Sequence, residues 1–368
     1  MARGDYSFDD NEISILTAAG VHVSARDLED FVARIFTAKD MRPDAAAIVS
    51  DVLCFANRRG IDSHGVSRIA SYLGYIDKGH LDPRAEPVLR TIGPSLFVLA
   101  AQRAAGPVAM TMALDEAIIR ARKGGVCVGL VSETTHTGAV GYYSSRAAAA
   151  DCAAVIVGAG PPNMAYHGAR VASLSTSPIT LAVPGGAGPL TLDMATSIAA
   201  MGRLNEARDA GEPLPEGWAL DADGEPTTDP DAAAITLPLG GPKGSGLALL
   251  IECVTGVLCG TPILTRMLGP NATRRHMQNA LILVIDIAAV RPVAEFRADI
   301  DRLSALVKAL PRRHEDVEIL LPGERGARAA ARTATTGIAL SKATWQRLGD
   351  IALSLGIALP PTGEPKDA

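Results

Sequence analysis

The chain has 368 residues, of which 48% are hydrophobic and 20% are charged, and its formal net charge is −5. This composition excludes wholesale disorder and is sufficient for two domains or one large α/β unit. The acidic balance predicts no nucleic-acid partner. Residues 1–10 are acidic where a secretory signal needs an apolar run, and no stretch approaches a membrane-spanning length. We therefore expect a soluble cytoplasmic protein with no membrane partner.

The first predicted elements are two helices that lead to residue 60. Ser24 is placed to cap an amphipathic pattern over residues 28–36, and Pro43 stands at the first position of a second pattern over residues 47–56. We expect these helices to support the stretch that follows them.

Residues 59–72 are predicted to form a loop that enters a helix, since Asp62 and Ser63 are both suited to cap the start of a helix. His64, Arg68 and Tyr72 are spaced four residues apart and would share one side of this helix. That side offers an imidazole able to move a proton, a bidentate cation and a phenol. Such a face suits a small carboxylate whose neighbouring atom gains or loses a proton. The alternative interpretation is a capping histidine followed by a solvated arginine.

The neighbouring Ser63 and His64 also raise the question of a serine hydrolase. Consecutive helical residues point about 100° apart, so we expect no nucleophile–base contact between these two side chains. No G-x-S-x-G turn occurs in the sequence either. The sequence therefore disfavours a serine hydrolase.

Helix and strand patterns alternate through the middle of the chain, which predicts an α/β core. They cover residues 108–121 (helix), 126–131 (strand), 139–150 (helix), 153–157 (strand) and 179–183 (strand), and residues 205–230 have the turn residues of a surface excursion. The last third predicts a helix over 244–258, a strand over 281–287, an amphipathic helix over 296–310, a strand over 317–321 and a final helix capped by Ser341.

A standard dinucleotide-binding turn is absent. Gly158-Ala159-Gly160 follows a strand, but prolines stand where the third glycine and the opening helix are required. The five cysteines are scattered through mostly apolar segments and no two histidines are three or four residues apart, so we expect reduced core cysteines and no metal site.

Three further stretches are candidate sites. His136 follows a predicted strand, where α/β proteins place ligands, although a surface histidine beside a capping threonine is equally compatible. Asp193 is suited to orient a histidine, to hold a ribose or to cap the next helix. Lys243 stands in a glycine-rich loop at a helix start, which suits an anion but lacks the spacing of a P-loop.

Six motifs occur in the order typical of one known protein family. They are Asp62-Ser63-His64-Gly65-Val66-Ser67-Arg68, Thr135-His136-Thr137-Gly138 with Gly141-Tyr142-Tyr143, Asp193-Met194-Ala195-Thr196-Ser197, Gly217-Trp218-Ala219, Lys243-Gly244-Ser245-Gly246-Leu247 and Pro322-Gly323-Glu324. On these motifs the chain resembles, over nearly its whole length, the malate/L-lactate dehydrogenase family. That family also includes sulfolactate, ureidoglycolate and diketogulonate oxidoreductases and cyclic-imine reductases.

The resemblance implies an α/β, non-Rossmann NAD(P)-binding fold of the sulfolactate dehydrogenase-like type, with a mixed sheet core and a mainly helical second domain. Residues 1–100 and 290–368 would form the helical domain for substrate and dimerisation, and residues 101–289 the central NAD(P)-binding domain. The resemblance also implies a homodimer with the active site between the two domains.

The same resemblance implies roles for individual residues. His64 would be the proton donor, Arg68 and Tyr72 would face the substrate together with Ser63, and His136 would lie near the substrate and nicotinamide, with Asp193 as a further catalytic residue. The implied cofactor-binding residues are Thr176, Ser177, Leu190, Thr191, Leu192, Asp193, Met194, Ala195, Thr196, Lys243, Gly244, Gly323, Glu324 and Arg325.

Our leading hypothesis is hydride transfer between NAD(P)H and a small 2-oxo acid or its 2-hydroxy acid. Arg68 would bind the carboxylate and His64, as imidazolium, would protonate the developing alkoxide. The sequence leaves NAD and NADP open, with NADPH slightly preferred. One alternative is reduction of a cyclic imine carboxylate of the piperideine- or pyrroline-2-carboxylate type.

A binding protein without catalysis is a further alternative, because the loop over residues 175–178 departs from the family pattern. The joint presence of His64, Arg68, Asp193 and Lys243 counts against it. There are two departures in all. Ser175-Thr176-Ser177-Pro178 stands where members usually have Gly-Thr-Asn-Pro, and Ala159-Gly160 where they usually have Thr-Asn. Both departures affect the predicted substrate and nicotinamide contacts.

Overall fold

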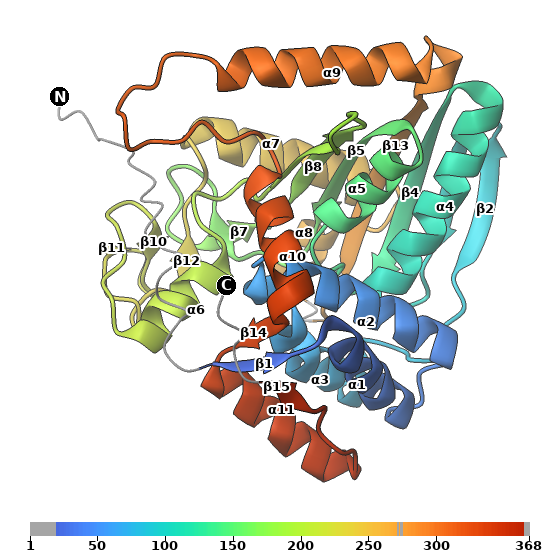
Figure 1. Ribbon diagram of the computed structural model, residues 1–368. Coiled ribbons are helices and arrows are strands. Elements are labelled where there is room, and N and C mark those ends of the chain that lie inside the picture. The colour runs from blue at the N-terminus through green and yellow to red at the C-terminus, as the bar shows by residue number, and fades with distance from the viewer. Residues whose placement is uncertain (1–19, 271, 273–274, 364–368) are drawn as a thin grey trace.

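The computed structural model describes residues 20–363 except 271 and 273–274 (Figure 1). Residues 1–10, on which the expectation about a secretory signal depends, lie outside this part of the chain. No helix in the described part is both long enough and apolar enough to cross a membrane.

A seven-stranded mixed sheet forms the centre of the molecule (Figure 1). Its order is β2 (Val88–Gly93), β3 (Leu96–Ala100), β4 (Val126–Thr134), β13 (Gln278–Asp286), β5 (Cys152–Ala159), β8 (Ile179–Val183) and β9 (Leu190–Met194). β3 and β4 run parallel, and the other neighbours run antiparallel. The predicted α/β class with a mixed sheet is confirmed, and this mostly antiparallel order differs from the parallel Rossmann sheet.

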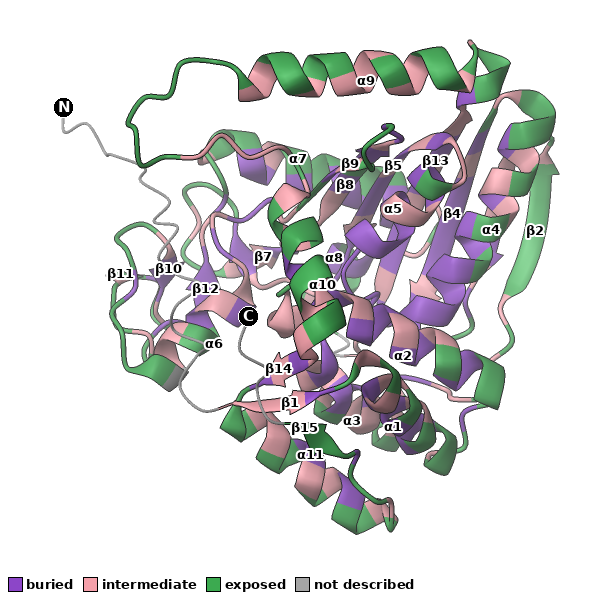
Figure 2. Ribbon diagram, in the orientation of Figure 1, coloured by how far each residue is buried: buried purple, intermediate pink, exposed green. Residues whose placement is uncertain are grey.

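Helices cover both faces of the sheet. α4 (Gly106–Gly124) and α5 (Gly141–Ala149) pack on one face, and α7 (Pro242–Glu252), the π-helical η4 (Cys253–Val257) and α8 (Ile263–Leu268) lie on the other. Buried alanines on α4 and α5 let these helices approach the strands closely, and this layer holds much of the buried core (Figure 2).

A mainly helical body lies beside this sheet. It contains α1 (Ala25–Ala38), α2 (Pro43–Arg58), α3 (Ile69–Asp77) and α11 (Lys342–Leu355), with a small sheet of β14 (Ile338–Leu340), β1 (Val21–Val23) and β15 (Thr362–Gly363). Two predicted caps are confirmed: Ser24 Oγ accepts from the Asp27 amide at 3.1 Å and Ser341 Oγ from the Thr344 amide at 3.2 Å. Pro43 is the first residue of α2, as predicted.

The predicted excursion over residues 205–230 is more structured than expected. It includes most of α6 (Met201–Ala210) and two strands of a five-stranded sheet. That sheet has the order β11 (Pro226–Thr227), β10 (Ala219–Leu220), β12 (Ile235–Thr236), β6 (Met164–Ala165) and β7 (Ala172–Leu174).

Two elements near the end of the chain differ from expectation. Residues 317–321, predicted as a strand, form no strand and lead into α10 (Glu324–Thr336). The predicted amphipathic helix is present as α9 (Val293–Lys308), following the 3₁₀ turn η5 (Ile287–Ala289), but none of its residues is buried in the chain (Figure 2). The apolar side of α9 therefore has little of this chain to pack against.

Strands β2 and β3 bear on the expected domain boundary. Residues 88–100 pair with β4 and belong to the same sheet as the central domain, which we expected to begin at residue 101. We propose the same two-domain division with residues 88–100 moved to the central domain.

Of the five free cysteines, Cys54, Cys127 and Cys152 are buried as expected, whereas Cys253 is exposed.

Candidate active site

The segment that carries His64 and Arg68 is not the single helix that the sequence predicts. Asp62–His64 and Val66–Arg68 form two 3₁₀ turns, and the α-helix α3 begins only at Ile69. Extended backbone at Gly65, with φ −91° and ψ −150°, separates the two turns. Neither turn has a side-chain cap, so the predicted capping by Asp62 or Ser63 is wrong.

Asn57 on α2 explains the interruption. Its side-chain oxygen accepts from the Val66 amide at 2.8 Å, and its side-chain nitrogen donates to Asp62 at 2.6 Å. These bonds replace part of the α-helical pattern, and they require a small residue at the point of closest approach. A Cβ on Gly65 would lie 2.2 Å from the Asn57 oxygen. The shape of the segment therefore depends on Asn57 and Gly65 together.

Ser63 also contacts His64 within the first of these turns. Ser63 Oγ lies 3.0 Å from His64 Nδ1, so the prediction that these side chains point apart is wrong. That prediction considered only the direction of each side chain from the helix axis, and the two side chains still bend close enough for a hydrogen bond. The Arg68 guanidinium donates to the Ser63 carbonyl, which holds Arg68 beside the same turn.

His136 joins the site from the loop after β4, as its place in the sequence predicts. Its ring centroid lies 5.5 Å from that of His64 and 5.7 Å from that of Tyr72. The Tyr72 hydroxyl donates to the His136 carbonyl at 2.7 Å, and the Gly138 amide donates to His136 Nδ1 at 3.2 Å. Nδ1 is thus an acceptor, which leaves the proton of the neutral ring on Nε2. Because Tyr72 is fully buried, its contact with substrate remains a prediction.

His276 is a member of the site that the sequence analysis missed. It precedes β13, and its ring stacks on Tyr75 at 4.3 Å. No spacing or motif in the sequence singles it out; only the fold brings residue 276 to residues 64–75. We call the side chains of Arg68, His64, Tyr72, Tyr75, His136 and His276 the Arg68 cluster.

Arg68 interacts electrostatically with the histidines of the Arg68 cluster. Burial, and then the charge of Arg68, lower the pKa of His64 to about 4. Burial and neighbouring positive groups, Arg68 included, lower the pKa of His276 to about 4 and that of His136 well below its usual value. No carboxylate pairs with Arg68 among the residues that the structure describes. Neutral imidazoles around an unpaired guanidinium form a site suited to an anion.

Asp193 on β9 has a different environment. Its carboxylate accepts from the Gly141 amide at 2.8 Å, at the start of α5. The capping alternative expected a contact with the next helix along the chain, whereas α5 precedes Asp193. Burial raises the pKa of Asp193 to about 6, against the lowering effects of this hydrogen bond and of Arg59. No hydrogen bond joins Asp193 to a histidine in the described part of the chain. Its catalytic role therefore remains a proposal.

A cavity of about 350 Å³ lies where several of the expected cofactor segments meet. Its lining residues are Met194, Thr196, Ile198, Leu239, Gly240, Lys243, Gly244 and Leu247. A Cβ on Gly244 would lie 2.6 Å from the Thr196 carbonyl and 2.5 Å from that of Leu239, so only glycine allows this close packing. Lys243 stands exposed at the first turn of α7, where helix amides favour an anion.

Hydrogen bonds connect the other expected cofactor residues to this region. The Thr176 carbonyl accepts from the Thr196 amide and hydroxyl, both at 2.8 Å, and Ser177 is buried with its side chain turned to Ser175. The Thr191 amide donates to the Pro322 carbonyl at 3.1 Å, which places Gly323 beside β9. Leu190, Leu192 and Ala195 belong to the same β9 segment or follow it.

The contacts of Glu324 and Arg325 give less support to their predicted role in cofactor binding. The Glu324 carboxylate binds Lys308 at 2.7 Å and Arg328 at 2.6 Å, so its charge is already compensated. Arg325 is exposed. Arg59, which the sequence analysis did not select, donates to the Gly323 carbonyl at 3.1 Å and lowers the pKa of Asp193, so it links these two segments.

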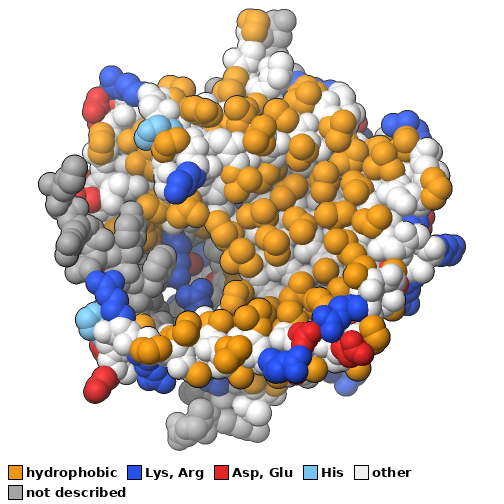
Figure 3. All heavy atoms as spheres, turned by 90° about the horizontal axis from the view of Figure 1, so that it is seen from above, with side chains coloured by type: hydrophobic (Ala, Val, Ile, Leu, Met, Phe, Trp, Pro, Cys, Tyr) orange, Lys and Arg blue, Asp and Glu red, His pale blue; other side chains and the backbone are white. Residues whose placement is uncertain are grey.

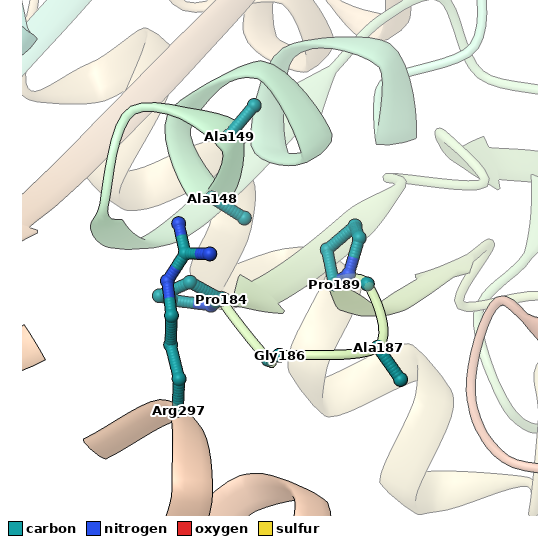
Figure 4. A pocket seen from close by; sticks show the side chains of 9 residues that line it. Ala148, Ala149, Pro184, Gly186, Ala187, Pro189 and Arg297 are labelled. Atoms are coloured by element: carbon teal, nitrogen blue, oxygen red, sulfur yellow. The ribbon is translucent and has the colours of Figure 1, made fainter. Parts of the chain in front are cut away.

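A second cavity, of about 260 Å³, is lined by none of the predicted site residues (Figure 4). The hairpin between β8 and β9 lines it together with Ala148, Ala149 and Arg297. Arg297 forms an ion pair with Asp151 at 2.5 Å, so this cavity offers no free charge from Arg297 to a ligand.

Comparisons with known proteins identify the family and the fold. The family described as malate/L-lactate dehydrogenase matches residues 23–349. The solved structure of sulfolactate dehydrogenase from Methanocaldococcus jannaschii has a TM-score of 0.81 and 29% identity, over 92% of this chain and 98% of that one. The expected sulfolactate dehydrogenase-like fold is thereby confirmed.

Two other relatives differ in the reaction that their names give. Ureidoglycolate dehydrogenase (NAD(+)) from Escherichia coli is 36% identical over 65% of this chain and 69% of its own length. The solved structure of δ1-piperideine-2-carboxylate reductase from Pseudomonas syringae has a TM-score of 0.77 and 29% identity, over 90% of this chain and 99% of that one.

Proposed function

The chain belongs to the malate/L-lactate dehydrogenase family, and on this premise we propose that it transfers hydride between NAD(P)H and a small 2-oxo acid or its 2-hydroxy acid. The observation that carries the proposal is the Arg68 cluster, in which neutral imidazoles surround a cation without an acidic partner in the described chain. A substrate carboxylate supplies the missing negative charge.

The 350 Å³ cavity supports binding of the dinucleotide. Lys243 and the first amides of α7 favour a pyrophosphate, while Met194 and Leu247 offer apolar surface. Lys243 has no ion pair among the described residues, so its charge is available to such a ligand. NAD and NADP both fit this chemistry, with NADPH slightly preferred.

The reduction consumes one hydride and one proton: a 2-oxo acid, NAD(P)H and H⁺ give a 2-hydroxy acid and NAD(P)⁺. The bound nicotinamide supplies the hydride. Arg68 holds the substrate carboxylate, and His64 donates the proton to the carbonyl oxygen as the new alcohol forms. In the oxidative direction His64 takes the hydroxyl proton. A carboxylate beside Arg68 offsets the positive charge that lowers the pKa of His64, so substrate binding promotes protonation of this ring.

A cyclic imine carboxylate is the second candidate substrate, and the lowered pKa of His64 favours it. With a pKa of about 4 this ring is mostly neutral at pH 7, whereas an iminium carries its own proton and needs no acid from the protein. The likeness to δ1-piperideine-2-carboxylate reductase supports the same candidate.

A substrate panel separates these candidates. Oxidation of NADH and NADPH is measured with pyruvate and oxaloacetate, and then with piperideine- and pyrroline-2-carboxylate, across pH 5–9. Faster turnover of the 2-oxo acids, with rates that fall as pH rises, supports the first proposal. Faster turnover of the imines supports the second. Cofactor binding without turnover of any of the four would identify a binding protein.

We also propose that the chain forms a homodimer through an extensive apolar face (Figure 3). Its members on α7 and the turn after it are exposed, with Leu250 63% and Leu258 64% accessible. Leu303 and Leu306 on α9 are exposed as well. Exposed apolar surface on this scale marks an interaction site, and a second copy of the chain provides a matching apolar face.

The oligomeric state tests this interface. Light scattering after size-exclusion chromatography is expected to give twice the chain mass of 38.1 kDa. Leu250→Glu combined with Leu258→Glu is expected to give a monomer, whereas Leu353→Glu on the exposed side of α11 leaves the dimer intact. A monomeric wild-type chain at micromolar concentration contradicts the proposal.

A further inference from the structure

Glu133 has a backbone conformation that residues other than glycine rarely adopt. Its φ is +56°, although it lies within the strand β4. Two other positive φ angles in the described chain, at Asp40 and Asp151, occur just after a helix, where left-handed backbone is common. Inside a strand this conformation is unfavourable, and it persists only where the surrounding structure holds it. Backbone strain of this kind is concentrated at functional sites.

The strain arises at a β-bulge between β4 and β13. The register of the two strands shifts by one residue at Asn279, which alone faces two residues of β4, Ser132 and Glu133. We call these three residues the Glu133 bulge. A bulge bends its strand, and bulges are frequent beside active sites, where they redirect a side chain. The bent strand continues through Thr134 into the loop that carries His136.

Hydrogen bonds from outside the strand ladder hold Glu133 in its conformation. Its amide donates to Asn279 Oδ1 at 3.0 Å, and its carbonyl accepts at 3.0 Å from the amide of Arg103, another residue with positive φ. Asn279 is fully buried, and its Nδ2 donates to the Thr261 carbonyl at 2.8 Å, which fixes its side chain. The Glu133 carboxylate is partly exposed and pairs with Arg275 at 3.1 Å. The backbone of Glu133 therefore depends on Asn279 and Arg103.

The loop after the bulge has little room to move. The Thr137 hydroxyl donates at 3.3 Å to the side-chain oxygen of Gln278, the neighbour of Asn279 on β13. A Cβ on Gly106, at the start of α4, would lie 2.2 Å from the His136 carbonyl oxygen, so the loop already touches α4. The direction in which β4 leaves the bulge therefore determines where the His136 ring lies, 5.5 Å from that of His64.

We propose that the Glu133 bulge positions His136 for the reaction, and that Asn279 holds the bulge in shape. This inference rests on the proposed function. Glu133 and Asn279 act through the backbone of residues 134–138 and not by contact with substrate, so both are positioning residues. A displacement of about 1 Å in the His136 ring is enough to lower turnover about 10- to 100-fold. The cavity beside Lys243 is formed by other elements and should keep its affinity for the cofactor.

Two substitutions at residue 133 separate the effect of its backbone from that of its charge. Glu133→Asn and Glu133→Val both remove the ion pair with Arg275, but asparagine tolerates a positive φ and a β-branched residue does not. kcat is measured with whichever of pyruvate, oxaloacetate, piperideine- and pyrroline-2-carboxylate turns over fastest. We expect it to be about 10- to 100-fold lower in Glu133→Val than in Glu133→Asn. The affinity for NADPH, measured by fluorescence titration, should differ less than about threefold between them.

Asn279→Ala tests the residue that holds the bulge. The substitution leaves the Glu133 amide without its acceptor, so kcat should fall about tenfold or more. In a Glu133→Gly background the same substitution should lower kcat less than about threefold, because glycine adopts a positive φ without strain. Ser50→Ala is the matched control for lost stability: it removes a buried hydrogen bond between α1 and α2 and should keep the wild-type kcat wherever it is folded.

The His136 ring also reports its position without any turnover. Its Nδ1 accepts from the Gly138 amide at 3.2 Å, which favours the tautomer with the proton on Nε2. Nitrogen NMR of the full chain with labelled histidine should show this tautomer in wild type and in Glu133→Asn, and a mixture of tautomers in Glu133→Val and Asn279→Ala. Lost stability alone leaves the tautomer of the folded protein unchanged, so this spectrum distinguishes positioning from a structural role.

Failure of this inference differs from failure of the proposed function. Equal kcat and equal His136 spectra in Glu133→Val and Glu133→Asn overturn the role of the bulge, and so does an equal loss from Asn279→Ala in both backgrounds. If Glu133→Val does not fold, Asn279→Ala in the two backgrounds decides. Absence of turnover of all four substrates by the wild-type chain overturns the proposed function, and the part of His136 in the reaction with it.

Discussion

Ser63 Oγ lies 3.0 Å from Nδ1 of His64, the next residue in the chain. This contact fixes the orientation of the imidazole and directs its other nitrogen, Nε2, away from the serine. If Nδ1 carries the proton and donates it to Ser63, Nε2 is left free to accept the hydroxyl proton of a 2-hydroxy acid. We therefore propose that Ser63 acts through His64, as a positioning residue.

The substitution Ser63→Ala removes this contact with His64. We expect kcat for oxidation of the 2-hydroxy acid to fall about tenfold, since the loss of a partner to a functional histidine has effects of about 10- to 100-fold. The affinity for the cofactor should stay within about twofold. Ser354→Ala, whose hydroxyl only contacts a carbonyl of its own helix, serves as control. Unchanged kcat in Ser63→Ala would show that the imidazole is positioned by other contacts.

His64→Ala tests the proton donor itself. We expect turnover of a 2-oxo acid to fall by about 10² to 10⁴, the usual contribution of a general acid, with cofactor affinity nearly intact. Stopped-flow turnover and fluorescence titration with NADPH measure the two quantities. Equal turnover in the variant removes His64 from the mechanism. A much smaller loss with a cyclic imine than with a 2-oxo acid would favour the imine reductase.

The sequence predicts the outline of this site better than its geometry. The spacing of His64, Arg68 and Tyr72 predicts one shared site, and the structure places the His136 ring 5.5 Å from that of His64 and 5.7 Å from that of Tyr72; the roles of these residues stay predictions. The contact between Ser63 and His64 lies in a turn flanked by hydrogen bonds of Asn57, which accepts from the Val66 amide and donates to Asp62, and no local pattern reports these bonds. His276 was missed for a related reason: its partners lie some 200 residues away in the sequence, and only the fold unites them.

The fold shows the same division between local and distant effects. Caps at Ser24 and Ser341 are local, and they were predicted correctly. Residues 317–321 have a strand-like apolar pattern, but they belong to none of the three sheets in the described part of the chain and form no strand. The pairing of β3 with β4 is likewise a tertiary contact, which is why we propose that the central domain begins before residue 101.

Arg68→Met tests the electrostatic coupling within the cluster. The variant keeps the length of the side chain and removes its charge, so the pKa of His64 should rise from about 4 toward 6.5 without reaching it, because burial is the larger cause. Titration of isotope-labelled histidine by NMR measures this shift. The KM for a 2-oxo acid should increase about 10- to 100-fold while that for NADPH changes little. An unmoved pKa would show that Arg68 lies too far from His64 to act on it.

The pH dependence of the wild-type enzyme follows from the same pKa. In the free enzyme the protonated form of His64 is lost above about pH 4, so kcat/KM for reduction should fall about tenfold per pH unit between pH 5 and 7. The kcat profile should fall only at higher pH, because bound substrate raises the pKa of His64. Protonation of this ring is disfavoured in the folded chain, so His64 lowers stability as pH falls from 6.5 to 4. A kcat/KM that is flat from pH 5 to 7 contradicts the role of His64 as acid.

Gly65→Ala tests whether the break between the two 3₁₀ turns shapes the site. An added Cβ would lie 2.2 Å from the Asn57 oxygen, so Asn57 must move and the buried Val66 amide loses its acceptor. We expect the free energy of unfolding to fall by about 2–4 kcal/mol, from steric overlap and an unpaired amide together. Because His64 immediately precedes Gly65, kcat should fall as well, even at temperatures where the variant is fully folded.

Gly74→Ala is the matched control: its Cβ meets nothing within 4 Å and it lies in α3, so alanine should stabilise the chain by up to about 1 kcal/mol. Denaturant unfolding and turnover of both variants measure these effects. A Gly65→Ala enzyme as stable and as active as wild type would show that the turns hold their shape without Asn57.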